Sequence, residues 1–297
     1  MPKVRLALVA AAAALGVSGA PLAHAGGPGS YFLSICAFSH RAADDPIVLP
    51  RAPGFSHDHT FVGNVSTDAF STMSSLRRAG SSCTPHGDTA AYWAPTLYVD
   101  AKPLAPVKAV VYYRRLTTAP VRPFPAGLRM VAGDSHATAP QSPSITYWDC
   151  SLLKTTFYAP NGGGATGGGA VVATTSSTVP VCPVKADVQL HVNFPSCWDG
   201  RRLDSVDHKS HMAYVVGERC PASHPVPVPA LSLIYSYPAR AVDAARSITL
   251  SSGGQLTGHA DFVNAWDERA LAKLVRGCLD NPHVQPTRDP TQQYNHC

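Results

Sequence analysis

Residues 194–214 hold the densest group of side chains that could do chemistry. The segment reads FPSCWDGRRLDSVDHKSHMAY, which places three aspartates and two histidines close to Trp198. An unpaired buried charge is prohibitively costly, so these groups must face water, pair with one another or form a site. The residues to which we assign chemistry are Asp204, Asp207, His208 and His211.

A hydrolytic mechanism can be written with these four side chains. One carboxylate could orient an imidazole, while another, with its pKa raised by the nearby negative charge, served as an acid. We predict Asp207 and His208 as the acid and base pair, oriented by His211 and Asp204. In the competing interpretation Asp204 caps a short helix and the histidines only satisfy backbone groups of irregular loops.

Two further segments have spacings that suit a metal site. His57 and His59 are two residues apart, as are His259 and Asp261, and side chains at that spacing on a strand point to one face. Imidazoles and carboxylates together bind divalent Zn, Cu, Mn or Fe. We predict that these four residues hold one divalent metal or complete the hydrolytic site. The sequence leaves open whether the two segments meet.

Aromatic side chains near these motifs could bind sugar rings. We predict Trp93 and Trp198 as substrate-binding platforms, with Tyr92 and Trp266 as further candidates. Platforms beside paired carboxylates would make a glycoside-cleaving cleft. The alternative is that the tryptophans belong to the hydrophobic core.

The elements that must position these groups are mostly strands. Alternating or β-branched patterns predict strands within residues 31–53, 88–99, 108–116, 128–132, 188–194 and 230–237. Helical spacing of apolar residues appears only in residues 66–78 and 267–279. No alternation of strands and helices is present, so we predict a mainly β fold, an antiparallel sandwich or jelly-roll-like single domain with long irregular loops.

The N-terminus predicts an exported protein. Lys3 and Arg5 precede an apolar stretch at residues 6–19, and Ala23-His24-Ala25 fits a signal-peptide cleavage site. We therefore assign residues 1–25 to a signal peptide and 26–297 to one domain, secreted and extracellular. No later stretch reaches the roughly 18 apolar residues of a membrane span. The glycine-rich segment 160–180 is predicted to be a flexible loop.

The cysteine count and the net charge indicate a disulfide-bonded protein that does not bind nucleic acid. Eight cysteines in an exported chain predict four disulfides, whose pairing the sequence leaves open. Without Lys3 and Arg5 the chain carries three more basic than acidic residues, which is too weak an excess to predict nucleic-acid binding. Asn64-Val65-Ser66 matches a glycosylation sequon, and the oligomeric state is left open.

Several motifs together resemble a known family. They are FSHRAADDPIV, SHDHTFVGN, AYWAPTLY, FPSCWDGRRLDSVDHKSHMAY, CPASHPVPVPAL and HADFVNAWD. In this order they resemble the DUF1996 family of secreted proteins, over nearly the whole mature chain. The resemblance implies an exported or cell-surface protein, in a family where some members carry carbohydrate-binding modules and no function is assigned. Where the family motif often has an acidic residue after its second histidine, this chain has Thr60.

Two classes of function follow from these patterns. The first is a carbohydrate-active hydrolase, glycoside-cleaving or metal-dependent, that acts on extracellular polysaccharide through a cleft lined by histidine and aspartate. The second is a non-catalytic module that binds cell-wall glycan or metal. A glycan-binding module needs exposed aromatics, so burial of Trp93 and Trp198 would count against it.

Overall fold

The computed structural model describes residues 30–151, 175–183, 186–242 and 246–281. The predicted signal peptide, residues 1–25, lies outside these ranges. Most of the glycine-rich segment 160–180 lies outside them as well.

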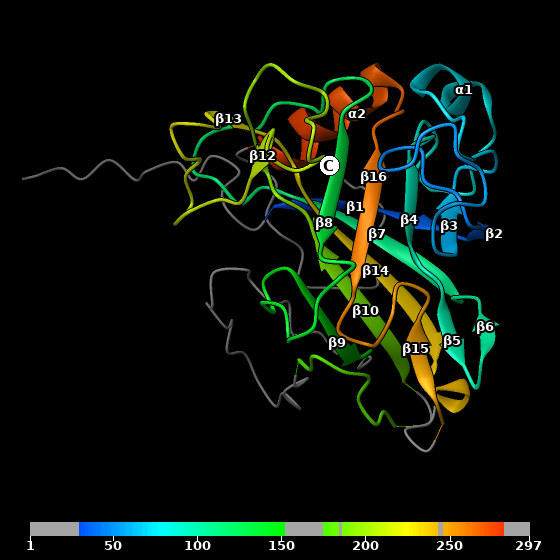
Figure 1. Cartoon of the computed structure of the whole chain (residues 1–297). Coiled ribbons are helices and arrows are strands. Elements are labelled where there is room, and N and C mark those ends of the chain that lie inside the picture. The colour runs from blue at the N-terminus through cyan, green and yellow to red at the C-terminus, as the bar shows by residue number, and fades with distance from the viewer. Residues whose placement is uncertain (1–29, 152–174, 184–185, 243–245, 282–297) are drawn as a thin grey trace, which may run out of the picture.

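Two five-stranded sheets form the body of the molecule (Figure 1). In sheet 1 the strands lie in the order β1 (Tyr31–Cys36), β7 (Lys108–Arg114), β14 (Ala230–Pro238), β10 (Asp187–Asn193) and β9 (Thr146–Cys150). In sheet 2 the order is β2 (Phe38–Ala42), β3 (His59–Gly63), β4 (Ala91–Pro95), β16 (His259–Val263) and β8 (Arg129–Gly133). Neighbouring strands in both sheets pair antiparallel. The predicted mainly β, antiparallel fold is confirmed.

Two smaller sheets and a few helices complete the described part of the chain. One small sheet contains β12 (Met212–Ala213), β11 (Cys197–Trp198) and β13 (Val226–Pro227), and the other contains β15 (Ile248–Leu250), β5 (Leu97–Val99) and β6 (Lys102–Leu104). The helical elements are α1 (Met73–Arg78), α2 (Glu268–Leu274), and the single turns η1 (Ala239–Ala241) and η2 (Val275–Leu279). In the described ranges no helix has the length and apolar character needed to cross a bilayer.

The helix predicted for residues 66–78 begins later than its apolar spacing suggested. Thr72 is the N-cap, because its hydroxyl accepts from the Ser75 backbone and the Ser75 side chain accepts in return from the Thr72 backbone. Before it, the Asn64 and Asp68 side chains accept from the backbones of Ser66 and Phe70. Such local bonds compete with helix formation, so these residues form turns.

The main core lies between the two large sheets. Along β7 every second residue is buried, and Val111 and Tyr113 point inward toward Tyr92 and Phe262 of sheet 2. The Trp266 indole nitrogen, just after β16, donates to the Tyr113 hydroxyl at 2.7 Å. Inward-facing aromatic side chains from both sheets therefore hold the sheets together.

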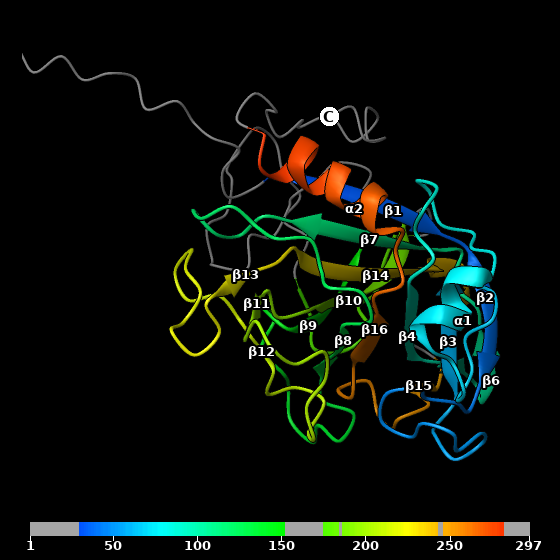
Figure 2. The ribbon, with the colours of Figure 1, turned by 90° about the horizontal axis from the view of Figure 1, so that it is seen from above.

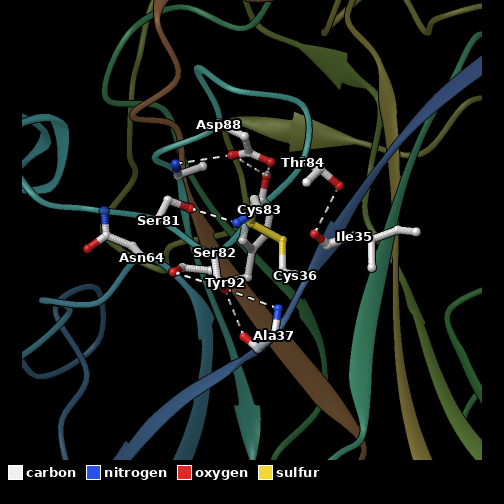
Figure 3. Close-up of a disulfide and its surroundings, with 12 residues drawn as sticks. Ile35, Cys36, Ala37, Asn64, Ser81, Ser82, Cys83, Thr84, Asp88 and Tyr92 are labelled. Atoms are coloured by element: carbon white, nitrogen blue, oxygen red, sulfur yellow. Dashed lines mark hydrogen bonds between the residues drawn. A yellow bond between two sulfur atoms is a disulfide. The ribbon is translucent and has the colours of Figure 1, made fainter. Parts of the chain in front are cut away.

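The chain passes from sheet 1 to sheet 2 through a single residue, Ala37, between β1 and β2. A disulfide from Cys36 to Cys83 lies at this crossing (Figure 3). Gly63 of β3 passes directly beside it with φ +79°, and a Cβ there would collide with the Cys83 sulfur. Only glycine fits this position, because any side chain would collide with the disulfide.

Two more disulfides join described cysteines, Cys150 to Cys182 and Cys197 to Cys220. Cys278 is disulfide-bonded as well. These bonds agree with the predicted disulfide-braced domain and are typical of proteins that fold in an oxidising compartment.

The outer face of sheet 2 carries a second, smaller core. Ile47 from the loop between β2 and β3 and Leu76 from α1 pack there against Phe61, Trp93 and Val263. Figure 1 and Figure 2 both place α1 near β3 and β4. This second core does not extend to the first residues of β3 and β16, where the side chains are polar.

Candidate metal centre

Two strands of sheet 2 begin with a histidine on the same outer face. β3 starts at His59 and β16 starts at His259, and alternation along β16 places Asp261 on the face of His259. In the ladder Asp261 lies opposite Trp93, which lies opposite Phe61 of β3. The two imidazoles and the carboxylate therefore share the face of sheet 2 that turns away from the main core.

The loop between β2 and β3 brings two more groups to this face. Asp45 is fixed by a tight turn in which its Oδ1 accepts from the backbone N–H groups of Ile47 and Val48, both at 2.8 Å. His57 lies two residues before β3 begins, and its ring centroid is 4.2 Å from that of His59. The segments around His57 and His259, whose meeting the sequence left open, lie side by side in the structure, with ring centroids 5.0 Å apart.

The hydrogen bonds of the rings fix which nitrogen carries the proton. Nδ1 of His59 lies 2.9 Å from the Asp44 carbonyl oxygen, and Nδ1 of His259 lies 2.8 Å from the Thr257 carbonyl oxygen. A carbonyl oxygen can only accept, so each Nδ1 is protonated and each neutral ring keeps its lone pair on Nε2. Metal-bound histidines typically have their other nitrogen held in this way.

Those Nε2 atoms point toward a shared space. Nε2 of His259 lies 3.1 Å from Nε2 of His57. Nε2 of His59 is buried and has no hydrogen-bond partner within the described part of the chain. One ligand atom from each of the three histidines lies within 4.8 Å of the others. This spacing allows three nitrogens to bind one metal ion.

Burial keeps the three rings neutral. Loss of water lowers the pKa of His59 well below its ordinary value, and the neighbouring His57 and His259 lower it further. The same cause lowers the pKa of His57 and lowers that of His259 to about 4. Metal ions bind neutral imidazole, so these rings are in the ligating form across the neutral range.

Two buried carboxyl groups adjoin the histidines. Asp261 is 1 % exposed, and within the described ranges neither of its oxygens has a hydrogen-bond partner. Burial raises its pKa well above the ordinary value, and the charge of Asp45 raises it further. Burial also raises the pKa of Asp45, against the lowering effect of its two backbone bonds. A buried carboxyl without a partner is rare, and a bound cation would satisfy it.

The ligand atoms form two overlapping groups that share His59. The first contains His57, His59 and His259, and the second contains Asp45, His59 and Asp261, each with its atoms within 4.8 Å of one another. A donor set of imidazoles and carboxylates suits Zn²⁺, Fe²⁺, Mn²⁺ or Cu²⁺. All four residues predicted as metal ligands therefore lie in this cluster, together with Asp45.

The loop of residues 199–211 lies beside this cluster. His208 has φ +56°, a conformation that few residues other than glycine adopt, and its Nδ1 lies 2.9 Å from Oδ1 of Asp204. Oδ2 of Asp204 lies 3.4 Å from Nη1 of Arg129. His208 is close enough to Asp45 for its charge to lower the pKa of that carboxyl. Asp204 and His208 thus form an aspartate–histidine pair next to the cluster.

Asp207 and His211 instead hold the loop in shape. Asp207 is at the surface, and its pKa is lowered by the backbone N–H of Ser210, the Ser205 hydroxyl and the backbone N–H of Lys209. Asp207 therefore stays ionised. A general acid requires a raised pKa, so the lowered pKa of Asp207 contradicts the rise that we predicted for the acid. His211 is fully buried, with Nε2 2.7 Å from the Arg129 carbonyl oxygen and Nδ1 2.9 Å from the Ser205 hydroxyl.

The two tryptophans predicted as sugar platforms differ in their exposure to solvent. Trp93 has no exposed surface and packs against Phe61 and His59. No face of its ring is available to a sugar, because Ile47 and Leu76 cover the outer face of sheet 2 at this point. Trp198 is half-buried, packs against the main core and donates its indole N–H to the Arg202 carbonyl at 2.6 Å.

Two residues at the candidate metal centre, Asp45 and Lys209, were not predicted from the sequence. Asp45 lies in the motif FSHRAADDPIV, where an acidic pair before proline was a signal that could have been used. Lys209 donates to the Gly133 carbonyl at 2.7 Å, and Gly133 pairs with His259. The charge of Lys209 lowers the pKa of Asp261 and of His259. No sequence pattern places this lysine beside β16, because its position depends on the fold of an irregular loop.

Comparisons with known proteins identify a family for this chain, but they do not identify an activity. The family model described as a domain of unknown function, DUF1996, matches residues 45–266, which span the cluster from Asp45 to Asp261. No curated protein and no solved structure gives a significant match.

Proposed function

Because the chain belongs to the DUF1996 family, which is described only as a domain of unknown function, we propose a function from the geometry: the protein binds a divalent transition-metal ion and uses it in hydrolysis. His57, His59 and His259 would be the nitrogen ligands. The observation that carries the proposal is that Nε2 of His57 and Nε2 of His259 lie 3.1 Å apart, beside the unpartnered Nε2 of His59.

Charge supports the same assignment. Three neutral imidazoles give the ion no negative charge, and the Asp261 and Asp45 carboxyls beside them can supply it. Burial raises the pKa of Asp261 well above its ordinary value, so it favours the protonated carboxyl in the metal-free protein. Metal binding would displace that proton, because the positive ion favours the carboxylate.

Hydrolysis is the reaction that this set of groups supports best. A metal ion held by histidines lowers the pKa of a bound water to near neutrality. The pair of His208 and Asp204 is suited to accept and return the proton, since the aspartate holds one ring nitrogen and leaves the other free. Arg129 in turn holds the aspartate.

The substrate class proposed is extracellular polysaccharide. It is supported by the disulfides, which are typical of exported proteins, and by the half-buried Trp198 in the loop that carries His208. Trp93 has no part in this proposal because its ring is buried. Metal binding without turnover would favour the second class, a non-catalytic metal-binding module.

Metal content tests the proposal directly. The exported protein is purified without chelator and its metal is measured by elemental analysis, for the wild type, His259→Ala and His86→Ala. His86 is an exposed histidine outside the cluster and serves as the matched control. We expect about one equivalent of metal in the wild type and in the control, and a large loss in His259→Ala. Equal metal content in all three proteins would refute the site.

Turnover is then measured separately. The metal-loaded protein is incubated with a panel of plant, fungal and bacterial polysaccharides, and released reducing ends are counted. We expect release that a chelator abolishes and that added metal restores. Metal binding with no product from any glycan would remove the hydrolytic part of the proposal and leave the metal site intact.

A further inference from the structure

A second site lies away from the metal cluster, where three neighbouring strands of sheet 1 end. The end of β7, the start of β14 and the end of β10 border a pocket of about 200 Å³. Leu116, Ile145 and Val215 give it apolar walls, and Asn193, Tyr214 and Ser232 add polar groups. No residue of the metal cluster lines it.

One cation faces this pocket. Arg114 is the last residue of β7, and its guanidinium carbon lies 4.5 Å from the centre of the Tyr112 ring. Stacking on an aromatic face leaves the N–H groups at the edge of the guanidinium free to donate. One of them, on Nη1, donates to the Ser232 hydroxyl at 3.3 Å.

The guanidinium has no acidic partner. Across the described ranges, no carboxylate lies within ion-pair distance of Arg114, although eight other such pairs form. The guanidinium is half-buried, and burial lowers its pKa. A partly desolvated cation without a counter-ion is unfavourable, so an anion that entered the pocket would be bound favourably.

A chain of hydrogen bonds fixes the polar wall. The Ser232 hydroxyl donates to Oδ1 of Asn193 at 2.6 Å, and the Asn193 amide donates to the Ser144 carbonyl at 3.2 Å. The Tyr214 hydroxyl donates to the Asn193 carbonyl at 2.9 Å. The Ser232 and Tyr214 hydroxyls are already used within the protein, and Arg114 is the charged group of the pocket wall that still has N–H bonds to offer a ligand.

We propose that this pocket binds a small organic carboxylate, with its carboxylate on the Arg114 guanidinium and its apolar body between Leu116, Ile145 and Val215. A single guanidinium matches the charge of a monoanion, and its parallel N–H groups match two carboxylate oxygens. The volume and the mostly apolar walls suit a short aliphatic or aromatic acid.

The test uses hexanoate and its neutral analogue hexanamide, which have almost the same shape. Binding to the full chain is measured by titration calorimetry, and the site is located from perturbed amide signals in NMR spectra. We expect saturable 1:1 binding of hexanoate, at least about tenfold tighter than hexanamide, because a hydrogen bond to a charged group is worth that much. The perturbed signals should come from Leu116, Ile145 and Val215.

Two arginine variants complete the test. Arg114→Gln should bind hexanoate and hexanamide equally weakly, whereas Arg122→Gln should behave as the wild type, because Arg122 is exposed and does not line the pocket. Circular dichroism checks that both variants are folded. If Arg114→Gln does not fold, the wild-type ratio and the location of the perturbed signals decide. Equal binding of the two compounds to the wild type, or signals perturbed elsewhere, would overturn the proposal.

Discussion

Replacing Asp261 by asparagine should have opposite effects on the metal-free and the metal-loaded protein. Asp261 is 1 % exposed in the middle of β16, its oxygens have no partner within the described ranges, and burial raises its pKa well above the ordinary value of 3.8. Asparagine has nearly the same shape but needs no proton to be neutral. The substitution therefore removes a titration while it preserves the packing.

The magnitude for the metal-free protein follows from linkage. A carboxyl whose pKa is raised in the folded state contributes stability at low pH that is lost as the pH rises above its unfolded value of 3.8. Each pH unit between 3.8 and the raised pKa costs about 1.4 kcal/mol of that stability. We expect metal-free Asp261→Asn to become more stable than the wild type as the pH rises from 4 to 7, by about 1.4 kcal/mol for each pH unit within that window, and to differ little from the wild type at pH 4.

The metal-loaded protein should respond in the other direction. At a metal concentration of 100 times Kd, binding stabilises the folded state by about 2.7 kcal/mol, which raises Tm by roughly 5 to 10 °C for a domain of this size. Loss of the carboxylate charge beside the ion should weaken binding by about 10 to 100-fold, as is typical for groups that support metal ligands. The metal-induced rise in Tm should then shrink or vanish in Asp261→Asn.

The assay is thermal unfolding of chelator-treated and metal-loaded protein at pH 4 and at pH 7, followed by circular dichroism. His86→Ala is the control for metal binding outside the cluster. An equal metal-induced rise in Tm for the wild type and Asp261→Asn would refute the placement of this carboxylate beside the ion. Equal metal-free stability of the two proteins at pH 7 would refute the reasoning about its proton.

Three other predictions can be checked with single preparations. Asp88 is buried, and burial raises its pKa to about 7, so the wild type should lose stability as the pH rises from 4 to 7. In urea titrations Asp88→Asn should show a smaller loss of stability over this pH range, and an unchanged loss would contradict the burial argument. Replacing Cys36 and Cys83 by serine opens a loop of 47 residues and should cost about 4 kcal/mol of unfolding free energy, whereas a loss below about 1 kcal/mol would mean that the loop is already constrained in the unfolded chain. His208→Ala should keep its metal and lose about 10² to 10⁴-fold in turnover, and an unchanged rate would remove this histidine from the mechanism.

Much of the architecture could be predicted because it follows local patterns. Alternation in residues 230–237 and the aromatic and β-branched residues of 108–116 predicted the strands that form β14 and β7, and the absence of strand–helix repeats predicted antiparallel sheets. The start of α1 was wrong by several residues, because side chains such as Asp68 bond to their own backbone and stop the helix from extending.

The candidate site could be predicted in part, for a physical reason. Spacing put His57 with His59, and His259 with Asp261, but only the pairing of β3, β4 and β16 brings the two pairs together. Trp93 could not be recognised as buried, because a tryptophan in a central strand and one in a cleft have the same local sequence. The roles of Asp207 and His211 depended on the turns of an irregular loop, which no periodicity encodes.

The direct passage from β1 to β2 has a mechanical consequence for the whole molecule. These are the edge strands of the two large sheets, and on the opposite side β8 and β9 are likewise edge strands that follow one another in the chain. The chain therefore connects the two sheets along both of their margins. Sliding one layer over the other is therefore resisted by covalent chain connections, a single residue at one margin and residues 134–145 at the other.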